Sequence, residues 1–318
     1  MQILCLAIGV CIYKPFIRMY EEQRELRLKR DVKRLVEEMQ REEQNNSISP
    51  YTKREDEIGH MARILADELV EAIRRKELFL VYQPQVNRDG RCIGAEALIR
   101  WEHPEFGFIY PPLIIQLAKE KKVLSTLEKF IFDTAGAALA QVRDIVPDDF
   151  KMSVNLTNES LEWDGIEACI ENVVQKYQFP NVQLGLEITE QDALSSSIDI
   201  TKKIEALKAK GHRFLIDDFG MGHTSLVYLQ TKYFNIVKLD GSLTRDVIHN
   251  ETNRDIIASI VYLGRSLKFK IIAEYVENEA QRDELKKLGC DAFQGYLYSK
   301  PIKLDELMSW IKGSGHES

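Results

Sequence analysis

Eight short runs of strand-forming residues, separated by helical stretches, constrain the fold of this chain more than any other feature. The runs are 78–86, 92–101, 152–157, 182–189, 213–219, 235–241, 270–276 and 291–299. Helical patterns lie between most of them; one example is 195–211, which begins with serine and stops at Gly211. Eight strands alternating with helices over about 250 residues predict an α/β fold, a closed (β/α)8 barrel of the TIM type.

The first two runs are joined by only five residues, Asn-Arg-Asp-Gly-Arg at 87–91. A parallel crossover needs a dozen or more residues, so this connection predicts an antiparallel hairpin. The barrel is therefore expected to be irregular at its opening strand.

Composition excludes several classes of protein. The chain has 318 residues, 44% hydrophobic and 29% charged, with a net charge of -7. This is typical of a globular protein with one large barrel or two ordinary domains. An acidic balance disfavours duplex nucleic acid as a partner. The five cysteines include no pair at CxxC spacing, which argues against a zinc site or a disulfide framework and indicates a reducing, cytoplasmic setting.

The chain begins with an apolar run, residues 1–13, that is shorter than the ~20 residues of a membrane-spanning helix. No positive charge precedes it, unlike a signal peptide. We interpret 1–17 as the end of a membrane helix whose beginning is missing, with Lys14 and Arg18 at the cytoplasmic edge; a buried core helix is the alternative. The stretch AIGVCIYKPFIRMYEEQ also faintly resembles the end of a sugar permease subunit of the phosphotransferase system.

A highly charged segment, 18–56, follows. Leu28, Val32, Leu35 and Met39 have the spacing of a coiled-coil seam. The pattern predicts a long exposed helix before the breaker NNSISPY, and both a short parallel coiled coil and a single solvated helix remain open. Residues 57–312 are then expected to form the barrel domain, and 313–318 a tail.

Polar side chains occur in the carboxyl-terminal half of each predicted strand. They are Glu96, Asn155, Glu187, Asp217, Lys238, Asp240, Glu274 and Gln294. In a barrel these strand ends converge on the face where active sites form. So many carboxylates would repel one another unless cations lay among them, and oxygen ligands without histidine or cysteine favour Mg²⁺ or Mn²⁺.

Two neighbouring pairs within this set need explanation. Asp217 and Asp218 are adjacent, so their side chains should diverge; this suits two bridged ions ~3.5–4 Å apart, the spacing of in-line phosphoryl chemistry. Lys238 and Asp240 are two residues apart and share one strand face. Lys238 could act on an attacking water or stabilise the phosphate, or the two residues could simply form an internal ion pair.

Seven motifs occur in the chain in a fixed order: EALIRW (96–101), SVNLT, LEITE, DDFGMGHTSL (217–226), VKLDGS, AEYVEN and FQGYLYSKPI. In these motifs the chain resembles the EAL domains, bacterial phosphodiesterases that hydrolyse cyclic di-GMP to linear pGpG. The resemblance covers about Glu57 to Ile311. It implies a (β/α)8 barrel with a reversed first strand, in agreement with the short 87–91 connection.

The resemblance also implies roles for individual residues. By motif, the metal ligands for two Mg²⁺ or Mn²⁺ ions are Glu96, Asn155, Glu187, Asp217, Asp218 and Asp240. Lys238 matches the lysine that contacts the catalytic water, and Glu274 is the second catalytic residue. Arg100 matches the arginine that grips the substrate phosphate, and Gln294 is a further substrate contact.

One loop, 219–226, is expected to follow the strand that carries the paired aspartates. Glu190 resembles the glutamate that anchors this loop, which begins with Phe219 and Gly220 and helps EAL domains to dimerise. The usual motif reads DDFGTGYSSL, so Met221 and His223 depart from it. His223 is either a catalytic base or a loop-packing residue.

A second departure is Tyr275, where the usual AEGVE motif has glycine. A bulky residue there could alter the packing beside Glu274 or narrow the site. Neither departure removes a ligand, so we expect an active phosphodiesterase. It would be the output module of a membrane-attached signalling protein at the inner face of the bacterial cell membrane, associating through residues 1–16. We expect a homodimer formed through the barrel and the N-terminal helix.

Two other functions are considered. The domain could be catalytically weak and act as a sensor that binds cyclic di-GMP, or it could be a barrel enzyme acting on a different phosphodiester.

Overall fold

The structure is a computed structural model that describes residues 65, 67–195, 197–220 and 233–314. The apolar segment 1–17, the charged segment 18–56, Met221, His223 and residues 315–318 lie outside the described residues. The described chain divides into two compact units. The first holds residues up to Leu78 together with 100–123, and the second holds 79–99 and the chain from Leu124 onward.

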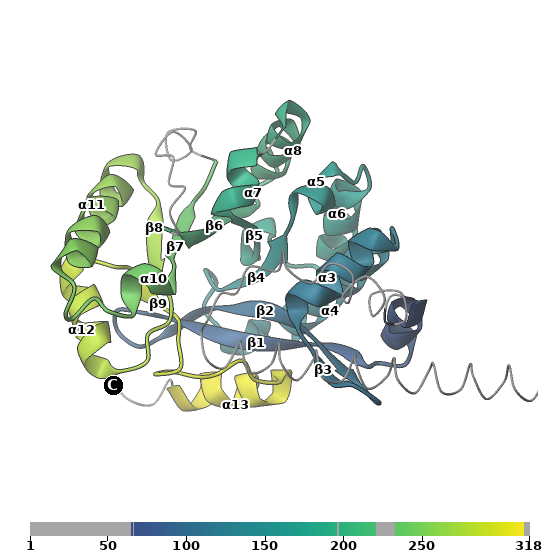
Figure 1. The fold of residues 1–318 in the computed structure, drawn as a ribbon, viewed down its shortest axis with the longest axis horizontal. Coiled ribbons are helices and arrows are strands. Elements are labelled where there is room, and N and C mark those ends of the chain that lie inside the picture. The colour runs from purple at the N-terminus through teal and green to yellow at the C-terminus, as the bar shows by residue number, and fades with distance from the viewer. Residues whose placement is uncertain (1–64, 66, 196, 221–232, 315–318) are drawn as a thin grey trace, which may run out of the picture. The chain divides into compact units, whose positions relative to one another are not determined.

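The second unit is built on a closed barrel of eight strands (Figure 1). They are β1 (Leu78–Asn87), β2 (Cys92–His103), β4 (Lys151–Leu156), β5 (Leu184–Thr189), β6 (Arg213–Phe219), β7 (Ile236–Leu239), β8 (Lys270–Ala273) and β9 (Ala292–Phe293). From β2 to β9 all neighbours are parallel, and β1 closes the barrel by pairing with β2 and, antiparallel, with β9. The predicted barrel is confirmed.

The opening hairpin is confirmed too. Asn87 N–H donates to the carbonyl of Arg91 at 2.9 Å, and Gly90 N–H to that of Asn87 at 3.0 Å. Gly90 has φ +80°, a left-handed conformation that glycine adopts without steric cost. This tight turn reverses the chain, so β1 runs against the other seven strands.

Helices connect the parallel strands, as the sequence pattern predicted, and one more follows the last strand (Figure 1). They are α4 (Leu124–Val142), α5 (Asn158–Glu162), α6 (Ile166–Tyr177), α7 (Glu190–Ser195), α8 (Ile198–Ala209), α10 (Gly241–Thr244), α11 (Glu251–Leu267), α12 (Glu279–Leu288) and α13 (Leu304–Ser314). Among the described residues, no helix is both long and apolar enough to cross a membrane.

The first unit contains a helix at 67–74, the end of β2, β3 (Gly107–Ile109) and α3 (Pro111–Glu120). His103 is buried, and its Nε2 lies 2.7 Å from Glu68 Oε2. Trp101 Nε1 donates to Glu77 Oε2 at 3.3 Å. These contacts give the polar atoms of two buried rings their partners.

The barrel interior has an apolar layer halfway along the strands. Leu215, Ile236, Ile272 and Ala292 are all buried and pack together. Because strand side chains alternate, residues two positions toward the carboxyl end point into the same interior. This alternation directs Asp217 and Glu274 to one mouth of the barrel.

Three predicted strands are too long. The predicted strand 291–299 is reduced to β9, because the chain turns after Phe293: a Cβ on Gly295 would lie 2.2 Å from the carbonyl oxygen of Val276. The predicted 270–276 ends at Ala273, before Tyr275 adopts φ +54°. The predicted 235–241 ends at Leu239, because Asp240 caps the next helix.

Candidate active site

A buried lysine lies among four carboxylates at the carboxyl ends of the strands. Lys238 Nζ is 2.8 Å from Glu187 Oε2, 2.9 Å from Asp217 Oδ1, 3.0 Å from Glu96 Oε2 and 3.0 Å from Glu274 Oε1. An ammonium has only three protons, so it cannot bond all four carboxylates at once. It donates hydrogen bonds to Glu96 and Glu187 and contacts the other two as ion pairs.

These contacts settle how Lys238 is neutralised in the barrel. The alternative of an internal pair between Lys238 and Asp240 is not what the structure shows, because the partners of Lys238 come from β2, β5, β6 and the end of β8. Burial alone would lower the pKa of Lys238. The nearby charges, led by Asp217, outweigh burial and raise that pKa well above the ordinary lysine value, which favours the protonated form of Lys238.

The carboxyl groups around this cation differ in how easily they ionise. Burial raises the pKa of Glu187 to about 8, and the negative charge of Glu96 adds to the effect. Burial also raises the pKa of Glu274 well above its ordinary value, although Lys238 opposes it. Burial acts on Glu96 in the same direction, but Lys238 and two amide donors outweigh it and lower the pKa of this residue.

The two amide donors belong to Asn155 and Gln294, both expected near the site. Asn155 Nδ2 donates to Glu96 Oε1 at 2.8 Å, and Gln294 Nε2 donates to Glu96 Oε2 at 2.7 Å. Together with Lys238 they satisfy both oxygens of Glu96. The expected roles of Asn155 as a metal ligand and of Gln294 as a substrate contact stay predictions.

Two further glutamines in β1 were missed. Gln85 Nε2 donates to Gln294 Oε1 at 2.8 Å, and Gln294 Nε2 donates to Gln83 Oε1 at 3.1 Å. These bonds fix the orientation of the Gln294 amide, and through it the amide contact to Glu96. The sequence did contain a signal for these two residues: Gln83 and Gln85 are two positions apart and therefore share one face of an otherwise largely apolar strand.

Asp217 and Asp218 are brought together by an irregularity in β6. The pairing of β6 with β7 shifts between Ile216 and Phe219, and Asp218 has φ +55°. In a regular strand the two side chains would diverge, but here carboxylate oxygens of Asp217, Asp218 and Glu274 all lie within 4.8 Å of one another. Burial, with the charge of Asp217, raises the pKa of Asp218 to about 7.

Two groups of carboxylates could hold metal ions, and Asp217 belongs to both. Oxygens of Glu96, Glu187 and Asp217 form the first group and those of Asp217, Asp218 and Glu274 the second, each within 4.8 Å. Lys238 contacts four of these carboxylates, and Glu187 Oε1 has no hydrogen-bond partner among the described residues. This excess of buried oxygen ligands fits hard divalent cations.

Asp240 is held differently from the other acids. Its Oδ1 accepts a hydrogen bond from Ser242 N at 2.7 Å and caps the amino end of α10. It belongs to neither carboxylate group. Its expected part as a metal ligand stays a prediction, while its cap explains why β7 stops where it does.

The glutamate expected to anchor the 219–226 loop contacts the start of that loop. Glu190 is buried, and its Oε2 accepts a hydrogen bond from Gly220 N at 3.0 Å. Gly220 has φ +109°, and Phe219 before it is buried. The rest of the loop lies outside the described residues, so a role in dimer formation stays a prediction.

Tyr275 replaces the expected glycine and keeps a glycine-like backbone, with φ +54°. Its carbonyl accepts a hydrogen bond from Gln281 Nε2 at 2.8 Å. Its ring is 41% exposed, lies 4.2 Å from the guanidinium carbon of Arg245 and covers Gly241, where a Cβ would be only 2.7 Å from the ring. The tyrosine is accommodated because Gly241 leaves room for it.

Arg100, the expected phosphate-gripping arginine, belongs to the first unit. Its guanidinium carbon lies 5.8 Å from the centroid of the Phe108 ring. Its expected contact with substrate stays a prediction.

Known proteins share both the sequence and the fold of this chain. A family model described as EAL domain matches residues 66–301. MucR of Pseudomonas aeruginosa, a bifunctional diguanylate cyclase/cyclic di-GMP phosphodiesterase, is 34% identical over 248 residues, which are 78% of this chain and 36% of that protein. PdeN of Escherichia coli, a probable cyclic di-GMP phosphodiesterase, is 29% identical over 246 residues, 77% of this chain and 47% of its own.

A solved structure agrees with these sequence matches. The PaMucR phosphodiesterase in complex with c-di-GMP has a TM-score of 0.71 and 34% identity, and the match covers 77% of this chain and 99% of that one. This chain thus spans between a third and a half of the curated relatives named above, but nearly all of the solved phosphodiesterase domain.

Proposed function

Because this chain belongs to the EAL domain family, we propose that it is a phosphodiesterase that hydrolyses cyclic di-GMP to linear pGpG. One observation carries the proposal: four carboxylates from different parts of the barrel surround Lys238 at its carboxyl-terminal mouth. A structural ion pair needs one carboxylate, whereas a site for a phosphodiester needs oxygen ligands for cations and a fixed positive charge.

Divalent cations fit this set of ligands, and we propose two Mg²⁺ or Mn²⁺ ions. Glu96, Glu187 and Asp217, with Asn155, would hold one, and Asp217, Asp218 and Glu274, with Asp240, the other. When bound, such ions activate water and neutralise phosphate charge. The protein itself is acidic, at net charge -7, and its substrate is a dianion, so this neutralisation is necessary.

The residues of the chain then have distinct tasks. Protonated Lys238 would donate a hydrogen bond to the oxygen of the attacking water and stabilise the negative charge that develops on the phosphate oxygens. Glu274, whose pKa burial raises well above its ordinary value, is the second proposed catalytic residue and would act on the reacting groups as an acid or base. Gln294 and Arg100 would contact the substrate, the latter by the bidentate geometry that guanidinium offers to phosphate.

The cellular context is also a proposal. Residues 1–17 would end a membrane helix, 18–56 would form a helical linker, 57–312 the catalytic domain and 313–318 a tail, in a homodimer at the inner face of the bacterial membrane. The apolar run and the seam at Leu28, Val32, Leu35 and Met39 support it. Recovery of the chain as a monomer wholly outside the membrane fraction would contradict this arrangement.

The site assignment is tested by comparing Glu96→Gln with Glu102→Gln, since both glutamates lie in β2. Glu96 is buried among the amides and Lys238, whereas Glu102 is exposed. We expect Glu96→Gln to lower the rate of cyclic di-GMP hydrolysis by at least about a hundredfold, the loss typical of removing an electrostatic catalytic group. The control should retain its rate; equal rates in both variants would refute the assignment.

A further inference from the structure

Three strands begin with a basic residue, at the end of the barrel opposite the carboxylates. Lys151 opens β4, Arg213 opens β6 and Lys270 opens β8. Each lies four residues before an acid or amide of the catalytic mouth, namely Asn155, Asp217 and Glu274. Strand side chains alternate, so an even separation places each basic residue on the inward face of its strand.

The three basic residues belong to one layer. In a barrel, inward side chains from alternate strands stack in layers, and β4, β6 and β8 are alternate strands of this sheet. The layer above them includes Leu215 and Ile272, which share one buried apolar cluster. Leu215 and Ser153 both border Gly185, because a Cβ added to this glycine would lie 3.0 Å from the Leu215 side chain and 3.2 Å from that of Ser153. Ser153 of β4 therefore lies at the same level as Leu215.

The interior therefore has three levels, with the carboxylates at one mouth, an apolar level in the middle and cations at the other mouth. The middle level separates the two charged ends. Electrostatics agree with this placement: burial lowers the pKa of Lys151, Asp149 opposes the shift, and the positive charges of Lys270 and Arg213 lower it further. Like charges must be close to act on one another in this way.

These cations have little compensation within the protein. Lys151 Nζ donates to the backbone carbonyl of Asp149 at 2.8 Å. The side chains of Arg213 and Lys270 are exposed and form no ion pair or hydrogen bond with the part of the chain that the structure describes. Three neighbouring cations, of which Lys151 has a nearby acid in Asp149, are a local feature that the net charge of -7 does not explain.

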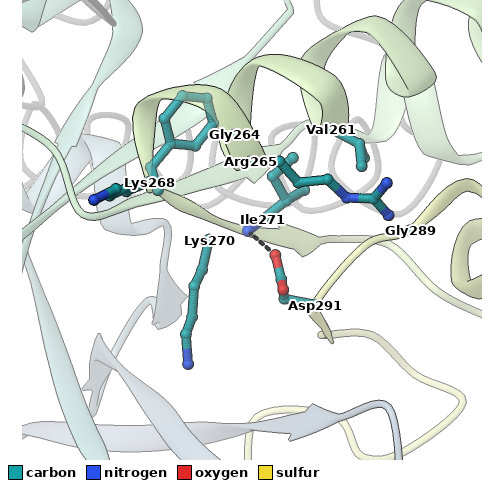
Figure 2. Close-up of a pocket in the computed structure, with 9 residues that line it drawn as sticks. Val261, Gly264, Arg265, Lys268, Lys270, Ile271, Gly289 and Asp291 are labelled. Carbon is teal, nitrogen blue, oxygen red and sulfur yellow. Dashed lines mark hydrogen bonds between the residues drawn. The ribbon is translucent and has the colours of Figure 1, made fainter.

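A cavity of about 260 Å³ next to this mouth adds further positive charge. Arg265, Lys268 and Lys270 line it, and Figure 2 shows their side chains extending in three different directions. Its one acid, Asp291, accepts a hydrogen bond from Ile271 N at 2.8 Å. The cavity thus widens the positive surface around Lys270.

We propose that the amino-terminal mouth of the barrel binds a di- or triphosphate group, held by Lys151, Arg213 and Lys270. Cations delivered from three strands can contact several phosphate oxygens at once, which favours a multivalent phosphate over a single carboxylate. The group could belong to inorganic diphosphate or to a nucleoside triphosphate. The mouth is a second anion site, separated from the catalytic carboxylates by the apolar level.

The test is calorimetric titration of the full chain with inorganic diphosphate, in EDTA and without cyclic di-GMP. These conditions keep the result independent of the proposed hydrolysis. The double variant Arg213→Gln with Lys270→Gln removes two charges from the mouth. The control, Lys202→Gln with Lys312→Gln, removes two charges from exposed positions on α8 and α13. Thermal unfolding checks that both variants are folded.

We expect the mouth variant to weaken diphosphate binding at least about tenfold, the effect of losing charge-assisted contacts. The control variant should change the affinity for diphosphate by less than about twofold. A parallel titration with GTP identifies the source: equal affinity assigns recognition to the phosphates alone, and tighter binding assigns it to a nucleotide. Absence of diphosphate binding in the unaltered chain, or equal weakening in the two variants, would overturn the proposal.

Discussion

Lys238 is a structural residue in the described site, and a catalytic role is proposed for it. It is fully buried and is held by Glu96, Glu187, Asp217 and Glu274. Without metal ions, the Lys238 ammonium offsets the electrostatic repulsion among these carboxylates. Under the proposed function, bound metal ions would share this neutralisation and leave the ammonium available to substrate.

The Lys238→Met variant should lose both thermal stability and hydrolysis. Methionine keeps much of the buried chain but removes the charge, and breaking a buried ionic network costs roughly 3–5 kcal/mol. We expect a large loss of thermal stability in EDTA, much of it restored by Mn²⁺, and no hydrolysis in either condition. Melting curves with and without metal test this; a variant as stable as the original in EDTA would contradict it.

Tyr275 allows backbone strain to be separated from ring packing. Its φ of +54° is costly for any residue with a Cβ, about 1–2 kcal/mol, and free for glycine. Tyr275→Ala and Tyr275→Gly both lose the ring and its contact with Arg245. We therefore expect the glycine variant to be more stable than the alanine variant by about 1 kcal/mol in urea denaturation. Equal stability would show that the backbone relaxes without cost.

At the scale of elements, α4 and α5 are joined through a buried carboxyl group outside the active site. Glu128 of α4 is 2% exposed and accepts a short hydrogen bond from Ser160 Oγ of α5, while its Oε2 has no partner among the described residues. Burial raises its pKa from 4.5 to about 7, although the Ser160 bond opposes this. The folded protein therefore holds a proton that the unfolded chain releases.

The sign of the pH effect follows from that difference. A pKa raised by folding contributes stability that is present below pH 4.5 and is lost as pH rises through about 7. The Glu128→Gln variant cannot ionise at this position. Relative to it, the free energy of unfolding of the original protein should fall by up to roughly 3 kcal/mol between pH 5 and 8. Urea denaturation across this range, with Mg²⁺ present, measures it. A constant difference between the two proteins would contradict the prediction.

Elements were predictable from sequence where one simple rule dominated. The alternation of strands and helices and the five-residue connection at 87–91 identified the barrel and its reversed strand. Strand ends were less predictable. The ends of β7 and β8 depend on the Asp240 cap and the positive φ of Tyr275, and the brevity of β9 depends on the contact of Gly295 with Val276. These are tertiary effects that local patterns do not contain.

The candidate site shows the same division. Strand-end positions identified Glu96, Glu187, Asp217 and Glu274, because a barrel brings such ends together. The convergence of Asp217 and Asp218 was not predictable, since it requires the irregular register between β6 and β7. The glutamines of β1 were not predicted because they act through Gln294 and lie in the reversed strand, to which the rule about carboxyl ends of parallel strands does not apply.

At the scale of the whole molecule, charge is distributed along the axis of the barrel. Carboxylates collect at one mouth and basic side chains at the other, with a largely apolar level between them. The proposed hydrolysis of an anionic dinucleotide by an acidic protein would require divalent cations at the first mouth. The proposed metal dependence would then be a property of the entire arrangement and of no single ligand.

The central claim is that this chain is a metal-dependent phosphodiesterase for cyclic di-GMP. The most direct measurement is chromatographic identification of the product after the purified chain is incubated with cyclic di-GMP and Mn²⁺, with EDTA and with Ca²⁺ in parallel. We predict one pGpG for each cyclic di-GMP consumed with Mn²⁺, and none with EDTA or Ca²⁺. Binding of cyclic di-GMP without product in Mn²⁺, or product in EDTA, would contradict the account.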